Sequence, residues 1–206
     1  MSDRLKYTCY FAGPMEHFGK EEMISSREEL FKGLSCPELG IYDPVRQESK
    51  KVGKPSGEQI DYIRGLKRGG HYEKFNEEMN KIWWGSVEVK SNTDIIQVLQ
   101  NLRMKRFIEG NRETDYCYWG DAEAVIRSDF VVVYLPTNAK TVGTYYEVLL
   151  AALFRIPVYL IVPDAPKTDT NSTLLWSVLG LTKGEVFYST QECINYIKEK
   201  YKLRVS

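Results

Sequence analysis

The sequence "DFVVVYLPTNAKTVGTYYEVLLAALFRIPVYLIVP", residues 129–163, gives the clearest indication of the fold. It opens with a nearly continuous apolar run, 129–136, which is typical of a parallel strand that is covered on both faces. The pattern over 143–155 predicts a helix, and the apolar run at 156–163 predicts a second strand. Two strands joined through a helix predict a βαβ unit.

The rest of the chain continues this alternation. Strands are predicted at 6–13, 40–44 and 184–190, and helices at 20–34, 120–128, 171–180 and 191–201. We therefore expect one α/β domain over 1–206, a Rossmann-like or flavodoxin-like three-layer sandwich with a mostly parallel five-stranded sheet. Ligands of such sheets bind beyond the carboxyl ends of strands, which nominates Gly13, Asp43 and the loop after Pro136.

The middle of the chain, 48–116, differs in composition and is rich in Lys, Arg, Glu and Asn. We interpret it as a helical insertion of two or three amphipathic helices, one beginning at Thr93-Asp94 with its apolar face over 95–104. It is either a packing or oligomerisation arm or a lid over the site. The pair Trp83-Trp84 suits both alternatives.

Charge and cysteine usage exclude several classes of protein. The 206 residues carry 28 Lys and Arg against 28 Asp and Glu, so the net charge is zero and no nucleic acid polymer is expected as a partner. The four cysteines are scattered without a CxxC pair, and both histidines lie far from them, so we expect no metal site. No GxGxxG or Walker pattern supports a dinucleotide or ATP site, and no cofactor is expected.

The apolar runs do not predict a membrane protein. The longest of them contains Glu147, Arg155 and Pro157, which argues against a membrane span. The N-terminal residues contain no apolar stretch of signal-peptide length. We therefore expect a cytoplasmic protein without membrane contact.

Two acids are candidates for chemistry. Glu147 lies in the first two turns of the predicted helix 143–155, where the helix dipole favours a carboxylate and bulky neighbours limit water. A carboxylate that is dry but charged is a useful nucleophile, although it can also do no more than complement the dipole. Asp121 opens the predicted short helix, where the alternative role is an N-cap. Two carboxylates that face one glycosidic bond can divide the work of cleaving it.

Three blocks of sequence occur in an informative order. They are "TCYFAGPM" (8–15), "WGDAEAVIRSDFVVVYLP" (119–136) and "VGTYYEVLLAALFRIPVYLIVPD" (142–164). Together they resemble the nucleoside 2-deoxyribosyltransferase family, which includes the related deoxynucleoside 5′-monophosphate N-glycosidases. The insertion is much longer than that family usually has.

The resemblance implies a role for each matching residue. Glu147 matches the nucleophile that forms a glycosyl ester at C1′, Asp121 the acid that helps the base leave, and Tyr10 the tyrosine that orients the nucleophile. Gly143 falls in the turn that lets the substrate approach, while Asp43 and Gln47 lie where the family reads the base. The implied activity transfers the sugar of a nucleoside or nucleotide to an acceptor base; the alternatives are hydrolysis of a nucleoside 5′-monophosphate and a non-catalytic nucleotide-binding module.

Thr141 departs from the pattern of the transferases, which often have an acid or amide at this position. A hydroxyl here resembles the 5′-monophosphate N-glycosidases, because a hydroxyl beside a helix N-terminus tolerates a phosphate. The alternative is an ordinary polar loop.

Further side chains could contact the same phosphate. Lys140 can add charge, and Ser177, with Ser172 and Thr173, offers hydroxyls that the resemblance places across a subunit interface. The family therefore also implies a homo-oligomer. His17 is either a phosphate or base contact or a plain loop histidine.

Overall fold

A computed structural model describes residues 5–14, 20–55, 58–85, 87–90, 92–109, 119–137, 139, 141–163 and 172–204. Five strands form one sheet, and each lies where the sequence predicts a strand: β1 (Tyr7–Ala12), β2 (Leu39–Tyr42), β3 (Phe130–Tyr134), β4 (Val158–Ile161) and β5 (Glu185–Phe187). The strand order is β2-β1-β3-β4-β5, and every neighbouring pair is parallel. This is the flavodoxin-like order of a doubly wound α/β sheet, which confirms the predicted fold class.

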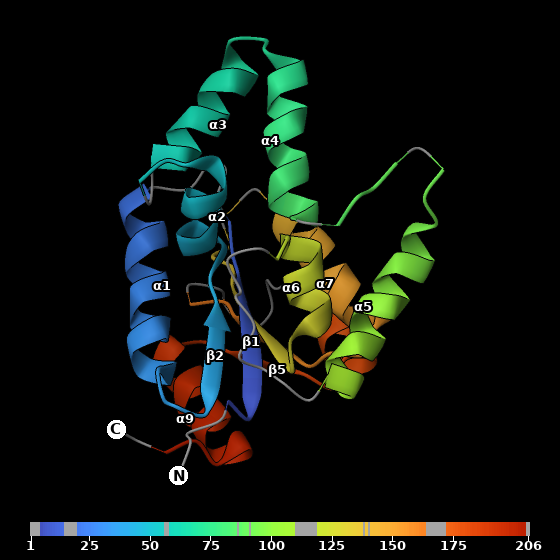
Figure 1. Cartoon of the computed structure of the whole chain (residues 1–206). Coiled ribbons are helices and arrows are strands. Elements are labelled where there is room, and N and C mark those ends of the chain that lie inside the picture. The colour runs from blue at the N-terminus through green and yellow to red at the C-terminus, as the bar shows by residue number, and fades with distance from the viewer. Residues whose placement is uncertain are drawn as a thin grey trace.

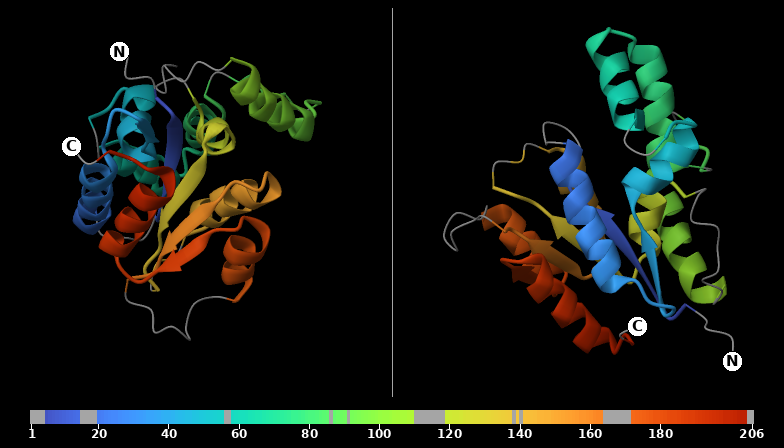
Figure 2. Two further views of the ribbon diagram at one scale, coloured as in Figure 1. Left: turned by 90° about the horizontal axis from the view of Figure 1, so that it is seen from below. Right: turned by 90° about the vertical axis from the view of Figure 1, so that its left-hand side faces the viewer.

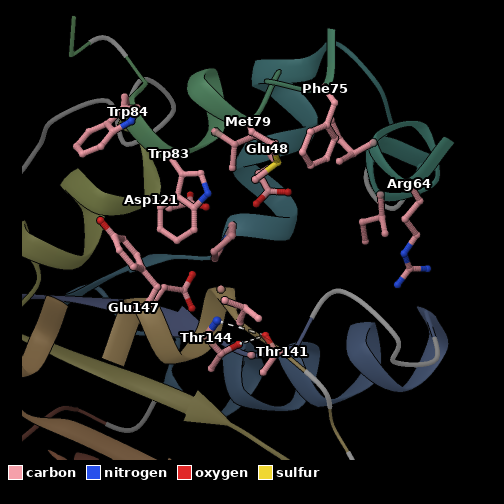
Figure 3. A pocket seen from close by; sticks show the side chains of 18 of the residues that line it. Glu48, Arg64, Phe75, Met79, Trp83, Trp84, Asp121, Thr141, Thr144 and Glu147 are labelled. Carbon is pink, nitrogen blue, oxygen red and sulfur yellow. Dashed lines mark hydrogen bonds between the residues drawn. The ribbon is translucent and has the colours of Figure 1, made fainter. Parts of the chain in front are cut away.

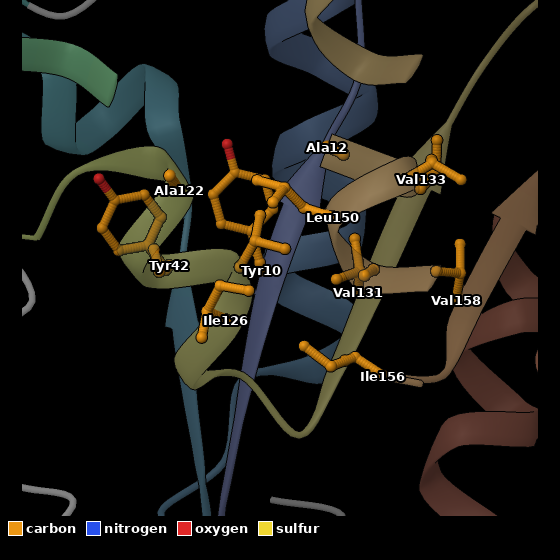
Figure 4. Packing of buried hydrophobic residues seen from close by; sticks show 14 of the residues in the cluster. Tyr10, Ala12, Tyr42, Ala122, Ile126, Val131, Val133, Leu150, Ile156 and Val158 are labelled. Carbon is orange, nitrogen blue, oxygen red and sulfur yellow. The ribbon is translucent and has the colours of Figure 1, made fainter. Parts of the chain in front are cut away.

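Helices cover both faces of this sheet (Figures 1 and 2). One face is covered by α1 (Lys20–Leu34) and α9 (Thr190–Tyr201), the other by α6 (Asp121–Arg127), α7 (Gly143–Leu153) and α8 (Ser172–Leu175) with the π-helix η2 (Trp176–Leu181). Successive strand residues point to opposite faces. In β1, Cys9 and Phe11 therefore pack toward α1 and α9, whereas Tyr10 and Ala12 pack toward α6 and α7 (Figure 4).

The connections define where a ligand can bind. The chain leaves β1 through α1 on one face to reach β2, and it enters β3 from α6 on the opposite face. The order of the strands therefore switches between β1 and β3. In doubly wound sheets the crevice beyond the carboxyl ends at such a switch is the usual ligand site.

Four helices occupy the region between β2 and α6: α2 (Pro44–Val52), α3 (Glu58–Arg68), α4 (Tyr72–Trp84) and α5 (Ile95–Glu109). The last three lie in the predicted insertion. The apolar face predicted over 95–104 is only partly confirmed, because Leu99 and Leu102 of α5 are buried whereas Ile96 and Met104 are exposed. Helix α2 was not expected, and it begins at Pro44 because the Asp43 side chain accepts a hydrogen bond from the Val45 amide as an N-cap, with proline at the first helical position. Helices α3 and α4 project beyond the sheet (Figure 1).

The helix predicted at 171–180 differs in its second half, which is η2 rather than α-helix. The hydroxyl of Thr182, just after η2, donates to the Val178 carbonyl at 2.5 Å and accepts from the Val158 amide of β4 at 3.2 Å. These two hydrogen bonds connect the end of the π-helix η2 to strand β4. Within the described part of the chain, no helix is both long and apolar enough to cross a membrane.

Candidate active site

A cavity of about 540 Å³ lies beside the end of β1, between the start of α7 and the helices α2, α3 and α4 (Figure 3). Its floor is Gly13 with 141–144 and Glu147, and Asp121, Arg27 and Glu48 line its sides. The remaining side, which we call the apolar wall, comes from α3 and α4 and consists of Ile60, Ile63, Phe75, Met79, Ile82 and Trp83. The cavity thus joins a polar floor to an apolar wall from the insertion.

Glu147 is buried in the second turn of α7, and its Oε1 accepts a hydrogen bond from the Tyr10 hydroxyl. Burial raises the pKa of Glu147 to about 8, and the nearby Asp121 charge adds to the rise. The Tyr10 hydrogen bond and the Arg27 charge act in the opposite direction by favouring the carboxylate. Glu147 is therefore a dry carboxyl held in one orientation at the cavity floor.

Asp121 is the first residue of α6, and it is buried at the side of the same cavity. Gly120, not Asp121, is the N-cap, so the capping alternative does not describe this acid. Its Oδ1 accepts from the Tyr42 hydroxyl at 3.1 Å and lies 3.7 Å from Lys51 Nζ, which also donates to Tyr42 at 2.5 Å. Burial raises the pKa of Asp121, and the Lys51 charge opposes that rise.

Two stacked tyrosines connect these acids. The rings of Tyr10 and Tyr42, on neighbouring strands, lie 5.4 Å apart at an interplanar angle of 16°. One hydroxyl bonds Glu147 and the other bonds Asp121. The adjacent strands therefore set the positions of both carboxyl groups.

The start of α7 opens into the cavity. Thr141 and Thr144 both line it, with their hydroxyl oxygens 3.0 Å apart, and the Thr144 amide donates to Thr141 Oγ1 at 3.3 Å. A side-chain carbon at Gly143 would meet no atom within 4 Å, so the floor is open above this turn. At Gly13 the same carbon would come within 3.1 Å of the Tyr134 carbonyl oxygen, which leaves little room for a side chain.

Several predicted substrate contacts lie elsewhere. Asp43 caps α2 and pairs with Arg27 at 2.8 Å, and neither Asp43 nor Gln47 lines the cavity. The side chain of Gln47 instead has a buried Oε1 without a partner among the described residues. Ser177 lies on η2, away from the cavity lining. His17, Lys140 and the side chains of Ser172 and Thr173 fall outside the described residues.

Glu48 is a third acid of the cavity and was not predicted. It lies on α2 one turn after Pro44, is only 1% exposed, and lines the cavity beside the apolar wall. Burial and the charges of Asp121 and Glu147 raise its pKa well above the usual range. The signal for it was the helical spacing of 44 and 48 directly after a strand. The predicted strand ends at 44 and the predicted insertion begins at 48, so the two positions fall in different predicted elements.

Comparison with known proteins adds a structural similarity. No protein-family model matches the chain, and no curated protein matches it. Among solved structures, a conserved protein from Enterococcus faecalis V583 is similar over 94% of this chain and 98% of its own, with 16% sequence identity and a TM-score of 0.45. That protein is described only as conserved, so its name suggests no activity.

Proposed function

We propose that the protein is an enzyme that cleaves the N-glycosidic bond of a (deoxy)nucleoside or nucleotide through a covalent glycosyl-Glu147 intermediate. The sugar then passes to another base, as in nucleoside 2-deoxyribosyltransferases. One observation carries the proposal: Glu147 is buried on a cavity at the switch point, is held by Tyr10, and shares that cavity with a second buried acid, Asp121. This pairing supplies a nucleophile and a proton donor.

In the first half-reaction, the ionised Glu147 carboxylate attacks C1′ of the sugar. The bond from C1′ to the base nitrogen breaks, its electron pair stays on that nitrogen, and Asp121 donates a proton to the departing base. The products are a glycosyl ester on Glu147, the free base and an ionised Asp121.

In the second half-reaction, the Asp121 carboxylate accepts a proton from an acceptor base, whose nitrogen attacks C1′. The ester C–O bond breaks, and Glu147 leaves as a carboxylate. Tyr10 steadies Glu147, while Tyr42 and Lys51 hold Asp121. Both acids return to their starting protonation states, so the cycle is balanced.

The start of α7 favours a second candidate, the hydrolysis of a nucleoside 5′-monophosphate. Thr141 and Thr144 offer two hydroxyls beside a helix N-terminus that faces the cavity, a combination that suits a phosphate. Water would then replace the acceptor base. A non-catalytic nucleotide-binding module is the third candidate, but two buried acids that repel each other are an unfavourable arrangement for binding alone.

The test is a panel of nucleosides and their 5′-monophosphates, incubated with and without an acceptor base and followed by chromatography. We expect free base and a new nucleoside or nucleotide from wild type. Glu147→Gln should lose at least a thousandfold in turnover while its circular dichroism is unchanged. Glu199→Gln, an exposed acid on α9, is the matched control and should keep wild-type activity.

Intact-mass spectrometry of wild type mixed with substrate should show the added mass of one glycosyl group, absent from Glu147→Gln. Free base accompanied by sugar phosphate rather than by an exchanged nucleoside would favour the hydrolase. Full activity of a folded Glu147→Gln variant would refute the nucleophile assignment. Retention of ligand without base release over hours would favour the binding module.

A further inference from the structure

Glu48 is a buried acid that the proposed reaction leaves unused. Its Oε1 is buried without a hydrogen-bond partner among the described residues, and no ion pair to it occurs in that part of the chain. Lys51 and Arg27, the cations whose charges favour ionised Glu48, contact other acids, because Lys51 lies at Asp121 and Arg27 pairs with Asp43. A buried polar group without a partner costs free energy, and a ligand that supplies the partner removes that cost.

The surroundings of Glu48 favour its neutral form. Asp121 of α6 and Glu147 of α7 are the acids that face it, and each makes a further negative charge less favourable. The charges of Lys51 of α2 and Arg27 of α1 lower the pKa of Glu48, but neither side chain forms an ion pair with it among the described residues. Arg64 of α3 also lines the cavity. Burial outweighs these cations, so the pKa of Glu48 stays well above its usual range.

Helix α4 contributes only uncharged side chains to the cavity around Glu48. Figure 3 shows the Glu48 carboxyl pointing into the cavity beneath Met79 and Phe75, across from Glu147 and Thr144. Apolar and aromatic faces with one polar group between them are the usual surroundings of a flat heterocycle. The described residues around this carboxyl form no metal-binding group.

We propose that Glu48 binds the base of the substrate by a paired hydrogen bond made as a neutral carboxylic acid. Its O–H donates to, and its carbonyl oxygen accepts from, adjacent groups on the amide or amidine edge of the heterocycle, which rests on the apolar wall. This inference rests on the proposed function and adds to it the residue that recognises the base and the form in which it acts.

The neutral and the ionised form of the Glu48 side chain make different hydrogen bonds. A neutral carboxyl presents one donor and one acceptor, whereas a carboxylate presents acceptors only. The edges of adenine and cytosine pair a ring-nitrogen acceptor with an amino donor, and those of guanine and uracil pair a ring N–H with a carbonyl oxygen. All of these complement the neutral acid. A glutamine has the same donor and acceptor but does not titrate.

The experiment compares Glu48→Gln with Glu48→Ala. Binding of free adenine, cytosine, guanine and uracil is measured by isothermal titration calorimetry between pH 5 and pH 10, and kcat and KM are measured where base is released. We expect Glu48→Gln to bind its preferred base within about threefold of wild type, and Glu48→Ala to bind at least tenfold more weakly with a larger change in KM than in kcat. Ser49→Ala, on the same helix but off the cavity, should match wild type.

The pH dependence of base affinity distinguishes a hydrogen-bonding role of Glu48 from a purely structural one. Wild-type affinity should fall as Glu48 ionises at high pH, and the fall should be smaller in Glu48→Gln, where Glu147, Asp121 and the base itself are the groups that still titrate. The inference is overturned if Glu48→Gln is as impaired as Glu48→Ala, if a folded Glu48→Ala binds like wild type, or if wild type binds none of the four bases. Because calorimetry needs no turnover, base binding that depends on Glu48 without any base release would refute the proposed function alone.

Discussion

Glu147 and Asp121 share one buried environment, and neither can ionise without affecting the other. Burial raises the pKa of both, and the Asp121 charge raises that of Glu147 further. Tyr10 and Arg27 favour charge on Glu147, while Lys51 and Tyr42 favour it on Asp121. The Asp121 charge also raises the pKa of Glu48, so Glu147, Asp121 and Glu48 titrate as one set of three acids. The reactive form in the proposed reaction has the charge on Glu147 and a proton on Asp121.

The Tyr10 hydroxyl should control the acidic side of the pH profile. Tyr10→Phe removes a hydrogen bond that favours ionised Glu147, so the pKa of Glu147 should rise above its value of about 8. Because the reaction needs the ionised form, kcat/KM should be lower at pH 7, and its rising limb should move to higher pH. The measurement is kcat/KM from pH 5 to pH 10.

Tyr159→Phe is the matched control. It removes a buried hydroxyl that bonds Tyr201 at 2.9 Å in the cluster on the opposite face of the sheet. This variant should leave the pH profile in place. A Tyr10→Phe profile that coincides with wild type would show that the hydroxyl does not tune the nucleophile.

The helices of the insertion contact different parts of the molecule. Helix α5 packs through Leu99 and Leu102 onto the core beside α6. Helices α3 and α4 instead form the apolar wall of the cavity. The end of α4 is held against α6 by a bridge between Gly85 and Trp119, and this contact places Trp83 beside Asp121.

The contact between the end of α4 and the start of α6 leaves no room for a side chain at Gly120. A side-chain carbon there would overlap the backbone of Trp83 and Trp84, which cannot move without shifting α4. We expect Gly120→Ala to lower the free energy of unfolding by about 1–3 kcal/mol and to impair activity. Urea denaturation and kcat/KM are the measurements.

Gly65→Ala provides the comparison within the insertion. A side-chain carbon at Gly65 in α3 meets nothing within 4 Å, so the change should stabilise by about 0.5–1 kcal/mol through helix propensity. If Gly120→Ala and Gly65→Ala changed the free energy of unfolding alike, the close contact between residue 120 and the end of α4 would not be the reason that position 120 requires glycine.

At the scale of the whole molecule, exposed apolar side chains gather on α7 and η2. Leu149 and Leu153 on α7 are 50% and 64% exposed, and Trp176 on η2 is 62% exposed. The two helices are in contact and pack against the same face of the sheet. Surfaces of this kind mark sites of association, and we propose that the protein is a homo-oligomer that uses this side.

A charge on this surface should weaken self-association. We expect Leu153→Glu to shift the protein toward the monomer in sedimentation velocity, because a buried unpaired carboxylate is unfavourable in an interface. Ile96→Glu, an equally exposed apolar position on α5, should leave association unchanged. Wild type that is monomeric at every concentration would disprove the proposal, and an effect of Ile96→Glu alone would place the contact on the insertion.

The pattern of residues along the chain is enough to predict the sheet and part of the cavity. Continuous apolar runs alternating with helical patterns specify buried parallel strands, because burial on two faces leaves no polar positions. The rule that ligands bind at strand ends nominates Gly13, Asp43 and the loop after Pro136. Gly13 and Thr141 of that loop line the cavity together with Asp121 and Glu147, whereas Asp43 does not. These inferences succeed because each depends on short-range pattern and strand direction.

The surroundings of those residues depend on tertiary packing and could not be predicted from local sequence. Lys51, Arg27 and Glu48 reach the site from α1 and α2, and the apolar wall comes from the insertion. Nothing in their local sequence distinguishes them from surface charges or from ordinary helix packing. Whether a carboxyl such as Glu48 is charged depends on burial and on neighbours far away in the chain, and packing alone brings those neighbours together.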